Sequence, residues 1–72
     1  MHFNTILKQV KSRRKDLQVT QAMLADLSGV SLRALKQFES GKGNPTLETL
    51  SKIAKALGME LNLQVKTPNF NP

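Results

Sequence analysis

The chain has 72 residues, contains no cysteine and carries a formal net charge of +6 at pH 7. A chain of this length forms one domain with a small core and has no room for a cleft that encloses a substrate, so we expect a binding module and not an enzyme. The charge leaves nucleic acid, an anionic membrane surface and an acidic protein as candidate partners, while the lack of cysteine excludes disulfides and thiolate metal sites.

The apolar residues are too scattered for a membrane segment. No apolar run approaches the roughly 18 residues that span a bilayer, and residues 1–10 lack the continuous apolar core of a secretory signal. We therefore expect a soluble, cytoplasmic protein. The single histidine, His2, lies next to the start of the chain, so we expect neither a metal site nor an imidazole base. We also expect no cofactor and no small-molecule substrate.

A first helix is predicted from about Asn4 to Lys15, because apolar residues recur there at helical spacing. The apolar positions are Phe3, Ile6, Leu7 and Val10. Polar residues cover the other side, and the basic ones among them are Lys8, Lys11, Arg13 and Lys15. These basic residues form either a second basic patch or, in the plainer interpretation, a solvated outer face.

Capping residues define two short helices after the first one. Thr20 is a good N-cap for the second helix, because its hydroxyl can accept a bond from a free backbone amide. Gly29 permits the left-handed backbone that ends this helix. Ser31 caps a third helix, which Ser40-Gly41 ends. The residues of the third helix expected in the core are Leu35 and Phe38.

A fourth helix is predicted between Thr46, its N-cap, and Gly58, where it stops. One face of this helix is apolar and consists of Leu47, Leu50, Ile53, Ala54 and Leu57. Residues 1–58 are therefore predicted to form one domain, an all-α bundle of four helices.

After Gly58 the pattern changes to an alternation of apolar and polar residues, which is typical of a half-buried strand. A lone strand leaves backbone amides and carbonyls unpaired, so its simplest partner is the same segment of a second copy. We therefore predict a dimerising strand over residues 59–66 and a flexible tail over residues 67–72. The strand residues expected at the contact between the copies are Leu61, Leu63 and Val65.

Two charged residues occupy positions where apolar ones are expected. Arg14 continues the apolar face of the first helix, and Glu39 follows Leu35 by one turn on the third. Each is costly to bury alone, whereas together they can form a bidentate hydrogen-bonded pair. We predict such a pair between the two helices; the alternative is that both side chains lie at helix ends and reach solvent.

Many positions between Ile6 and Gly58 agree at fixed spacing with one known family. They are Arg14, Val19-Thr20-Gln21, Leu24-Ala25, Gly29-Val30-Ser31, Leu35, Phe38-Glu39-Ser40-Gly41-Lys42, Asn44-Pro45-Thr46-Leu47-Glu48-Thr49-Leu50 and Ile53-Ala54-Lys55-Ala56-Leu57-Gly58. The chain thus resembles the phage-repressor helix-turn-helix family, also called Xre-like or lambda-repressor-like. In that family the positions matching Arg14 and Glu39 form a salt bridge between helices. One departure is Gln18, where relatives usually have glycine, and it affects the turn between the first two helices.

The resemblance implies a sequence-specific DNA-binding repressor, whose third helix enters the major groove while the second crosses the DNA backbone. Arg33 can then pair with guanine, Gln37 with adenine and Leu32 with a thymine methyl group. The expected base contacts are Leu32, Arg33, Lys36 and Gln37. The expected phosphate contacts are Gln21, Ser31, Lys42 and Asn44. For each of them the plainer interpretation is a solvated surface residue.

The predicted C-terminal strand is similar to that of the HipB-like antitoxins. In that subgroup the strand pairs across a dimer, and the protein represses its own operon and binds a HipA-type kinase toxin. The similarity implies a homodimer on a palindromic operator, in the bacterial cytoplasm and associated with the nucleoid when bound. Two alternatives stay open, namely a solitary Xre-type phage or stress regulator without a toxin, and a protein-interaction module that binds no DNA.

Overall fold

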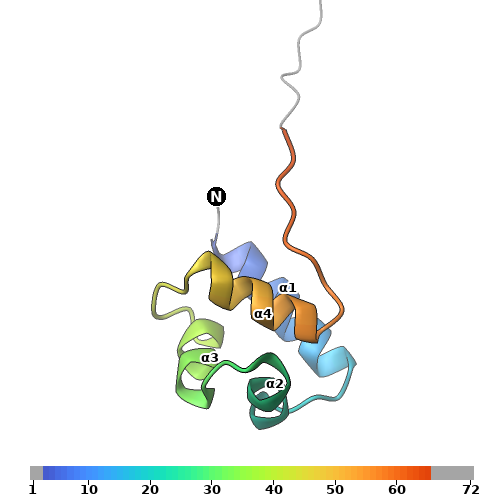
Figure 1. Cartoon of the computed structure of the whole chain (residues 1–72), viewed down its shortest axis with the longest axis vertical. Helices are drawn as coiled ribbons and strands as arrows, with labels where there is room; N and C mark the ends of the chain where they lie inside the picture. The colour runs from blue at the N-terminus through green and yellow to red at the C-terminus, as the bar shows by residue number, and fades with distance from the viewer. Residues whose placement is uncertain (1–2, 66–72) are drawn as a thin grey trace, which may run out of the picture.

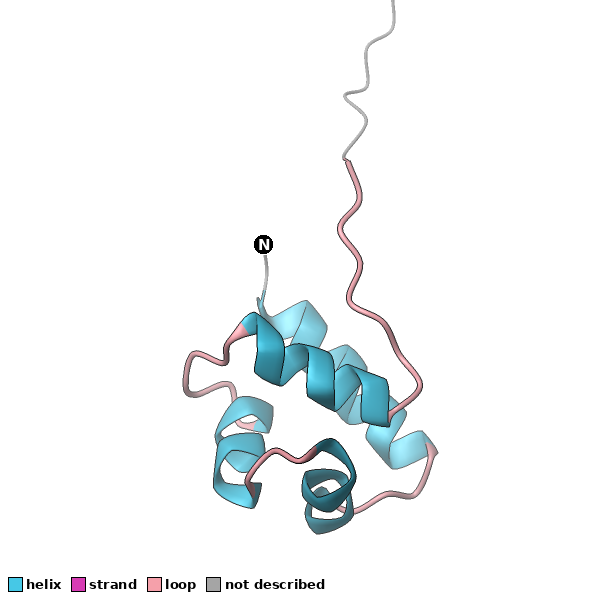
Figure 2. Ribbon diagram, in the orientation of Figure 1, coloured by secondary structure: helices cyan, strands magenta, loops and turns pink. Residues whose placement is uncertain are grey.

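The computed structural model describes residues 3–65, which form four helices and no β-strand in that part of the chain. The helices are α1 (Phe3–Asp16), α2 (Gln21–Ser28), α3 (Leu32–Glu39) and α4 (Leu47–Ala56). Figures 1 and 2 show α2 and α3 gathered together beneath α1 and α4. The predicted all-α bundle is confirmed, whereas the predicted tail over residues 67–72 lies outside the described residues.

Three of the helices begin at hydroxyl caps. The hydroxyl of Thr20 accepts a bond from the amide of Met23 at 3.0 Å, which satisfies one of the free donors at the start of α2. Ser31 and Thr46 cap α3 and α4 in the same way, at 3.1 Å each. The three predicted N-caps are therefore confirmed, and each helix starts where a short polar side chain can replace water.

Left-handed backbone marks the turns on either side of α2. Gly29 has a φ of 74° at the end of the helix, and its amide donates to the carbonyl of Ala25. Gln18, in the turn between α1 and α2, has a φ of 57° and is the one non-glycine with positive φ among the described residues. Because a side chain in this conformation costs about 1–2 kcal/mol, the turn is strained at Gln18.

The core draws apolar side chains from all four helices. Its members are Leu7, Val10, Leu24, Ala25, Val30, Leu35, Phe38, Ile53 and Leu57. α2 packs against both α3 and α4, and α1 packs against α3. Each large side chain buried in this way contributes about 1.5–3 kcal/mol, so the core fixes the position of α3 relative to the other helices.

Two apolar segments are more exposed than the sequence pattern indicates. Leu47, on the predicted apolar face of α4, is 73% exposed, because that face is covered only from Leu50 onward. Residues 59–65 follow α4 and form no strand within the described part of the chain. In this segment Leu63 and Val65 are 90% and 92% exposed. A groove between α1, α4 and this segment is lined by apolar residues that include Ile6, Val10, Leu47, Leu50, Met59 and Leu61.

Within residues 3–65, no helix combines the length and the apolar character that crossing a bilayer requires.

Candidate nucleic-acid interface

The turn between α2 and α3 is anchored to the core. Val30 lies at its centre and is 9% exposed, while its amide donates to the hydroxyl oxygen of Ser28 at 3.2 Å. The Ser28 hydroxyl in turn donates to the carbonyl of Ala25 at 3.4 Å. These contacts order the turn that leads from α2 into α3, the two helices that a helix-turn-helix protein places against DNA.

α3 has one buried face and one exposed face. Leu35 and Phe38 are 0% and 1% exposed and attach the helix to the core. The residues outside this buried face are Leu32, at its edge, and Arg33, Lys36 and Gln37, opposite to it, and all of them are exposed. The structure thus brings the predicted base-contacting residues together on one side of a short, rigidly attached helix, where two cations and an amide face solvent.

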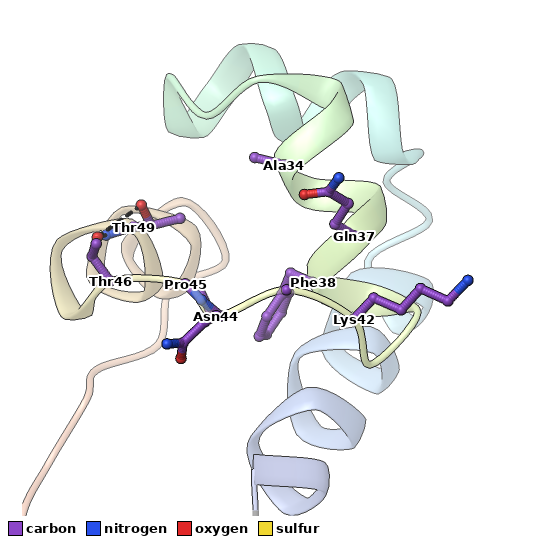
Figure 3. Close-up of a pocket in the computed structure, with 9 residues that line it drawn as sticks. Ala34, Gln37, Phe38, Lys42, Asn44, Pro45, Thr46 and Thr49 are labelled. Atoms are coloured by element: carbon purple, nitrogen blue, oxygen red, sulfur yellow. Dashed lines mark hydrogen bonds between the residues drawn. The ribbon is translucent and has the colours of Figure 1, made fainter.

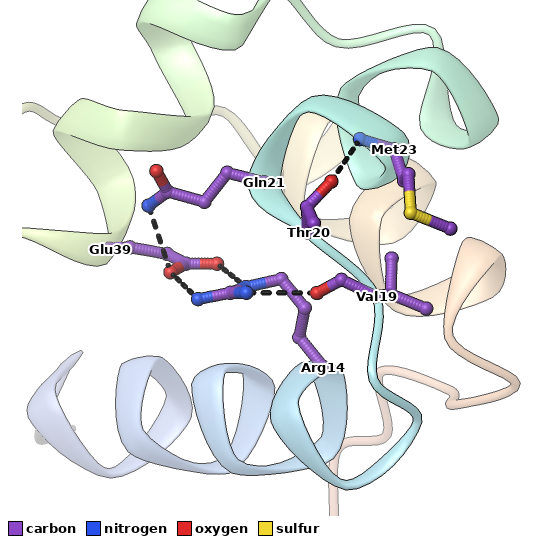
Figure 4. A network of polar contacts seen from close by, with 6 residues as sticks. All are labelled: Arg14, Val19, Thr20, Gln21, Met23 and Glu39. Atoms are coloured by element: carbon purple, nitrogen blue, oxygen red, sulfur yellow. Dashed lines mark hydrogen bonds and ion pairs between the residues drawn. The ribbon is translucent and has the colours of Figure 1, made fainter.

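Arg14 and Glu39 join α1 to the end of α3. Arg14 donates from Nε to Glu39 Oε2 at 2.7 Å and from Nη2 to Oε1 at 2.8 Å, which gives the bidentate geometry (Figure 4). Its third nitrogen, Nη1, donates to the carbonyl of Val19 at 2.9 Å. The side chains are only 11% and 3% exposed. The pair therefore also holds the chain that leads into α2.

Gln21 makes a contact that sequence reasoning missed. It is the first residue of α2, and its Nε2 donates to Glu39 Oε1 at 3.1 Å (Figure 4). The side chain is half-buried, and this bond uses one of the two N–H groups of its amide. The only hint in the sequence is that a bidentate arginine fills two of the roughly four lone-pair sites of a buried carboxylate, which leaves room for a further donor.

The predicted phosphate contacts after α3 lie beside a shallow hollow. Lys42 and Asn44 line this hollow, which has a volume of about 220 Å³, together with Gln37 and Thr46 (Figure 3). Both residues are exposed, and Figure 3 shows Lys42 extending away from the loop. Ser31 is exposed at the start of α3, where its oxygen accepts from Ala34 and its hydroxyl proton can be donated outward.

Comparisons with known proteins give a consistent set of relatives. A transcriptional repressor, RstR, of the cryptic phage CTXphi from Vibrio cholerae is 44% identical over 57 residues, which cover 79% of this chain and 51% of the relative. The immunity repressor protein of Bacillus phage phi105 is 34% identical over 58 residues, covering 81% of this chain and 40% of the relative. An uncharacterised helix-turn-helix transcriptional regulator of Haemophilus influenzae is 36% identical over 58 residues, covering 81% and 59% respectively.

The chain spans about half the length of these relatives. No solved structure gives a significant match. The family model described as helix-turn-helix matches residues 10–64, which include α2, the turn, α3 and α4. On this match and on the geometry of α2 and α3, the chain belongs to the phage-repressor-like helix-turn-helix family of transcription regulators.

Proposed function

We propose that this protein is a sequence-specific DNA-binding repressor that inserts α3 into the major groove. The observation that carries the proposal is the exposed face of α3, where Arg33, Lys36 and Gln37 lie opposite the buried Leu35 and Phe38. Arg33 would pair with guanine and Gln37 with adenine, and each bidentate pair discriminates against a wrong base by about 1–3 kcal/mol. Leu32 would meet a thymine methyl group, and Lys36 a base or a phosphate.

Backbone contacts would set the register of α3 on the duplex. Gln21 and Ser31 stand at the N-termini of α2 and α3, where free amides favour phosphate, and Lys42 and Asn44 follow α3 on an exposed loop. Such contacts carry no sequence information but fix position and orientation. In this proposal residues 1–58 are the DNA-binding unit.

Dimerisation would align two copies of α3 with a palindromic operator. Residues 59–66 of one chain would pair with those of another through Leu61, Leu63 and Val65, whose exposure in the single chain supports a partner. Two half-sites about 34 Å apart, one turn of DNA, would then receive the two recognition helices.

A more specific role is that of a HipB-like antitoxin bound to a HipA-type kinase toxin. It is supported by the alternating pattern of residues 59–65, and the toxin would dock on faces away from α3. The second candidate is a phage-type repressor without a toxin. The names of two relatives, a phage repressor and a phage immunity repressor, favour this second role.

Affinity purification of the tagged protein from its native cells tests these roles together. A kinase-sized protein that co-purifies with the chain's own promoter would support the antitoxin role. Promoter DNA alone would support the solitary repressor. Protein partners without DNA, held equally at low and high salt, would contradict DNA binding and leave an interaction module, because phosphate contacts weaken steeply with salt.

A further inference from the structure

Contacts on α1 distinguish its two flanks. On one flank, Arg14 binds Glu39 of α3, and a Cβ built on Gly41, just after α3, would lie 3.6 Å from Leu7. On the other flank, Arg13 donates from Nε to the carbonyl of Leu57 at 3.0 Å, and Ile6 lines the groove shared with α4. One side of α1 therefore adjoins the end of α3, and the opposite side adjoins α4.

Three lysines follow one another along α1, beside the side of this helix that adjoins α3. Lys8, Lys11 and Lys15 are spaced by three and four residues, which stacks them on one helix face. At about 100° per residue, this face lies next to Leu7 and Arg14 and faces away from Arg13. We call Lys8, Lys11 and Lys15 the lysine flank. Arg13 does not belong to the lysine flank, because its side chain bonds to the carbonyl of Leu57 at the end of α4.

The lysine flank has no acidic partner among the described residues. The ion pairs among the described residues are Arg14–Glu39 and Lys52–Glu48, and neither includes a lysine of the flank. The buried Glu39 already accepts hydrogen bonds from Arg14 and Gln21. Like charges at this spacing repel, so the helix is weakened by them. The helix dipole favours Lys15, which lies in the last turn of α1, but it gives no support to Lys8 and Lys11 in the middle of the helix.

The position of the lysine flank next to α3 indicates what it binds. Leu7, next in sequence to Lys8, lies under Gly41, and Gly41 is followed by Lys42, one of the proposed phosphate contacts. The flank is therefore continuous with the edge of the surface around α3. We propose that Lys8, Lys11 and Lys15 bind DNA phosphates and extend the backbone contacts from the loop after α3 onto α1. This inference rests on the proposed function.

A pair of matched double variants tests the proposal. Lys8→Gln with Lys11→Gln removes two charges from the lysine flank, and Lys52→Gln with Lys55→Gln removes two charges from the solvent side of α4. DNA affinity is measured for each between 50 and 200 mM salt, on a duplex that contains the operator and on a random duplex of equal length. The full chain is used throughout, and thermal melting followed by circular dichroism checks that both variants are folded.

We expect the first pair to make the negative slope of log affinity against log salt shallower by about 1.8, since each phosphate contact contributes about 0.9 to its magnitude. The wild type would then lose about 12-fold more affinity than this variant across that salt range, on both duplexes. The control pair should keep nearly the full slope. The melting temperature of the first pair should equal or exceed that of the wild type, because a repulsion is removed.

Three results would overturn the inference. Equal changes of slope in both pairs would show that the salt dependence of DNA affinity reflects the net charge of the protein and not the position of the lysines. If the wild type binds DNA and the slope of the first pair is unchanged, the lysine flank does not bind phosphates, and the proposed function stays intact. If that pair then loses an acidic protein partner, the lysine flank binds that partner. A wild type that binds neither duplex would overturn the proposed function itself.

Discussion

At the scale of single residues, the contacts proposed for α3 and for the loop after it would separate specificity from general affinity. Arg33 is exposed on the helix that would enter the groove. Lys42 extends from the loop beyond that helix (Figure 3). A base contact distinguishes sequences, while a phosphate contact attracts every duplex equally. The two cations are thus expected to respond differently to the same substitution.

Arg33→Ala should weaken operator binding by about 1–3 kcal/mol more than it weakens binding to random DNA. Lys42→Ala should weaken binding to the operator and to random DNA by similar amounts. It should also reduce the magnitude of the slope of log affinity against log salt by about 1. Titrations of both duplexes at several salt concentrations measure each effect. Equal losses on the two duplexes in both variants would contradict this division of roles.

Gln18 offers a second test at this scale, because its φ of 57° is strained and its side chain is exposed. Gln18→Gly should raise the free energy of unfolding by about 0.5–1 kcal/mol, since glycine adopts this conformation without strain but loses more entropy on folding. Urea denaturation measures the change. Gln18→Ala is the matched control, and a gain as large as that of the glycine variant would show that the backbone strain is not the cause.

At the scale of elements, the buried carboxylate of Glu39 connects three helices. It accepts from Arg14 on α1 and from Gln21 on α2, and it belongs to the last residue of α3. No buried side-chain nitrogen or oxygen lacks a partner among the described residues, so this network is complete. A complete network is costly to interrupt, because each group that loses its partner stays buried.

Glu39→Ala should therefore destabilise the fold by about 3–5 kcal/mol, because it leaves the Arg14 guanidinium buried without its partner. The double variant Arg14→Met with Glu39→Leu should recover most of that loss, since it removes both charges together. Chemical denaturation of the wild type, Glu39→Ala, the single variants Arg14→Met and Glu39→Leu, and the double variant measures the coupling. Additive losses would show that the two side chains do not stabilise each other.

Local chemistry explains which parts of the fold could be predicted from sequence. Thr20, Ser31 and Thr46 act within three residues of their partners, so the pattern of each cap is visible in the chain itself. The bond from Gln21 to Glu39 joins residues 18 apart and depends on how α2 packs on α3, which no local pattern specifies. The exposure of Leu47 likewise depends on where the other helices end.

At the scale of the whole molecule, the helices and residues 59–65 differ in how well they are packed. The helices share one core, whereas Leu63 and Val65 in the segment after α4 are almost fully exposed. Apolar residues on an unpaired extended segment favour association with another chain. Assembly is therefore expected to depend on this segment more than on the helical core.

Leu63→Lys should weaken the dimer and, through it, binding to a two-site operator, because a charge would have to be buried between the copies. Gln64→Lys adds the same charge to the opposite face of the proposed strand and should leave assembly nearly unchanged. Sedimentation velocity at several concentrations gives the oligomeric state of each. A Leu63→Lys variant that sediments as the wild type does would contradict the proposed strand.

The sharing of one carboxylate by α1, α2 and α3 also bears on how long the protein persists. If any of these helices detached, the remaining ones would keep a buried charge or amide without its partner, so partial opening would cost nearly as much as complete unfolding. Proteases would then reach the helices chiefly through the fully unfolded chain. The supply of binding-competent protein would follow a single folding equilibrium, and a change of 1–2 kcal/mol in that equilibrium would alter abundance several-fold.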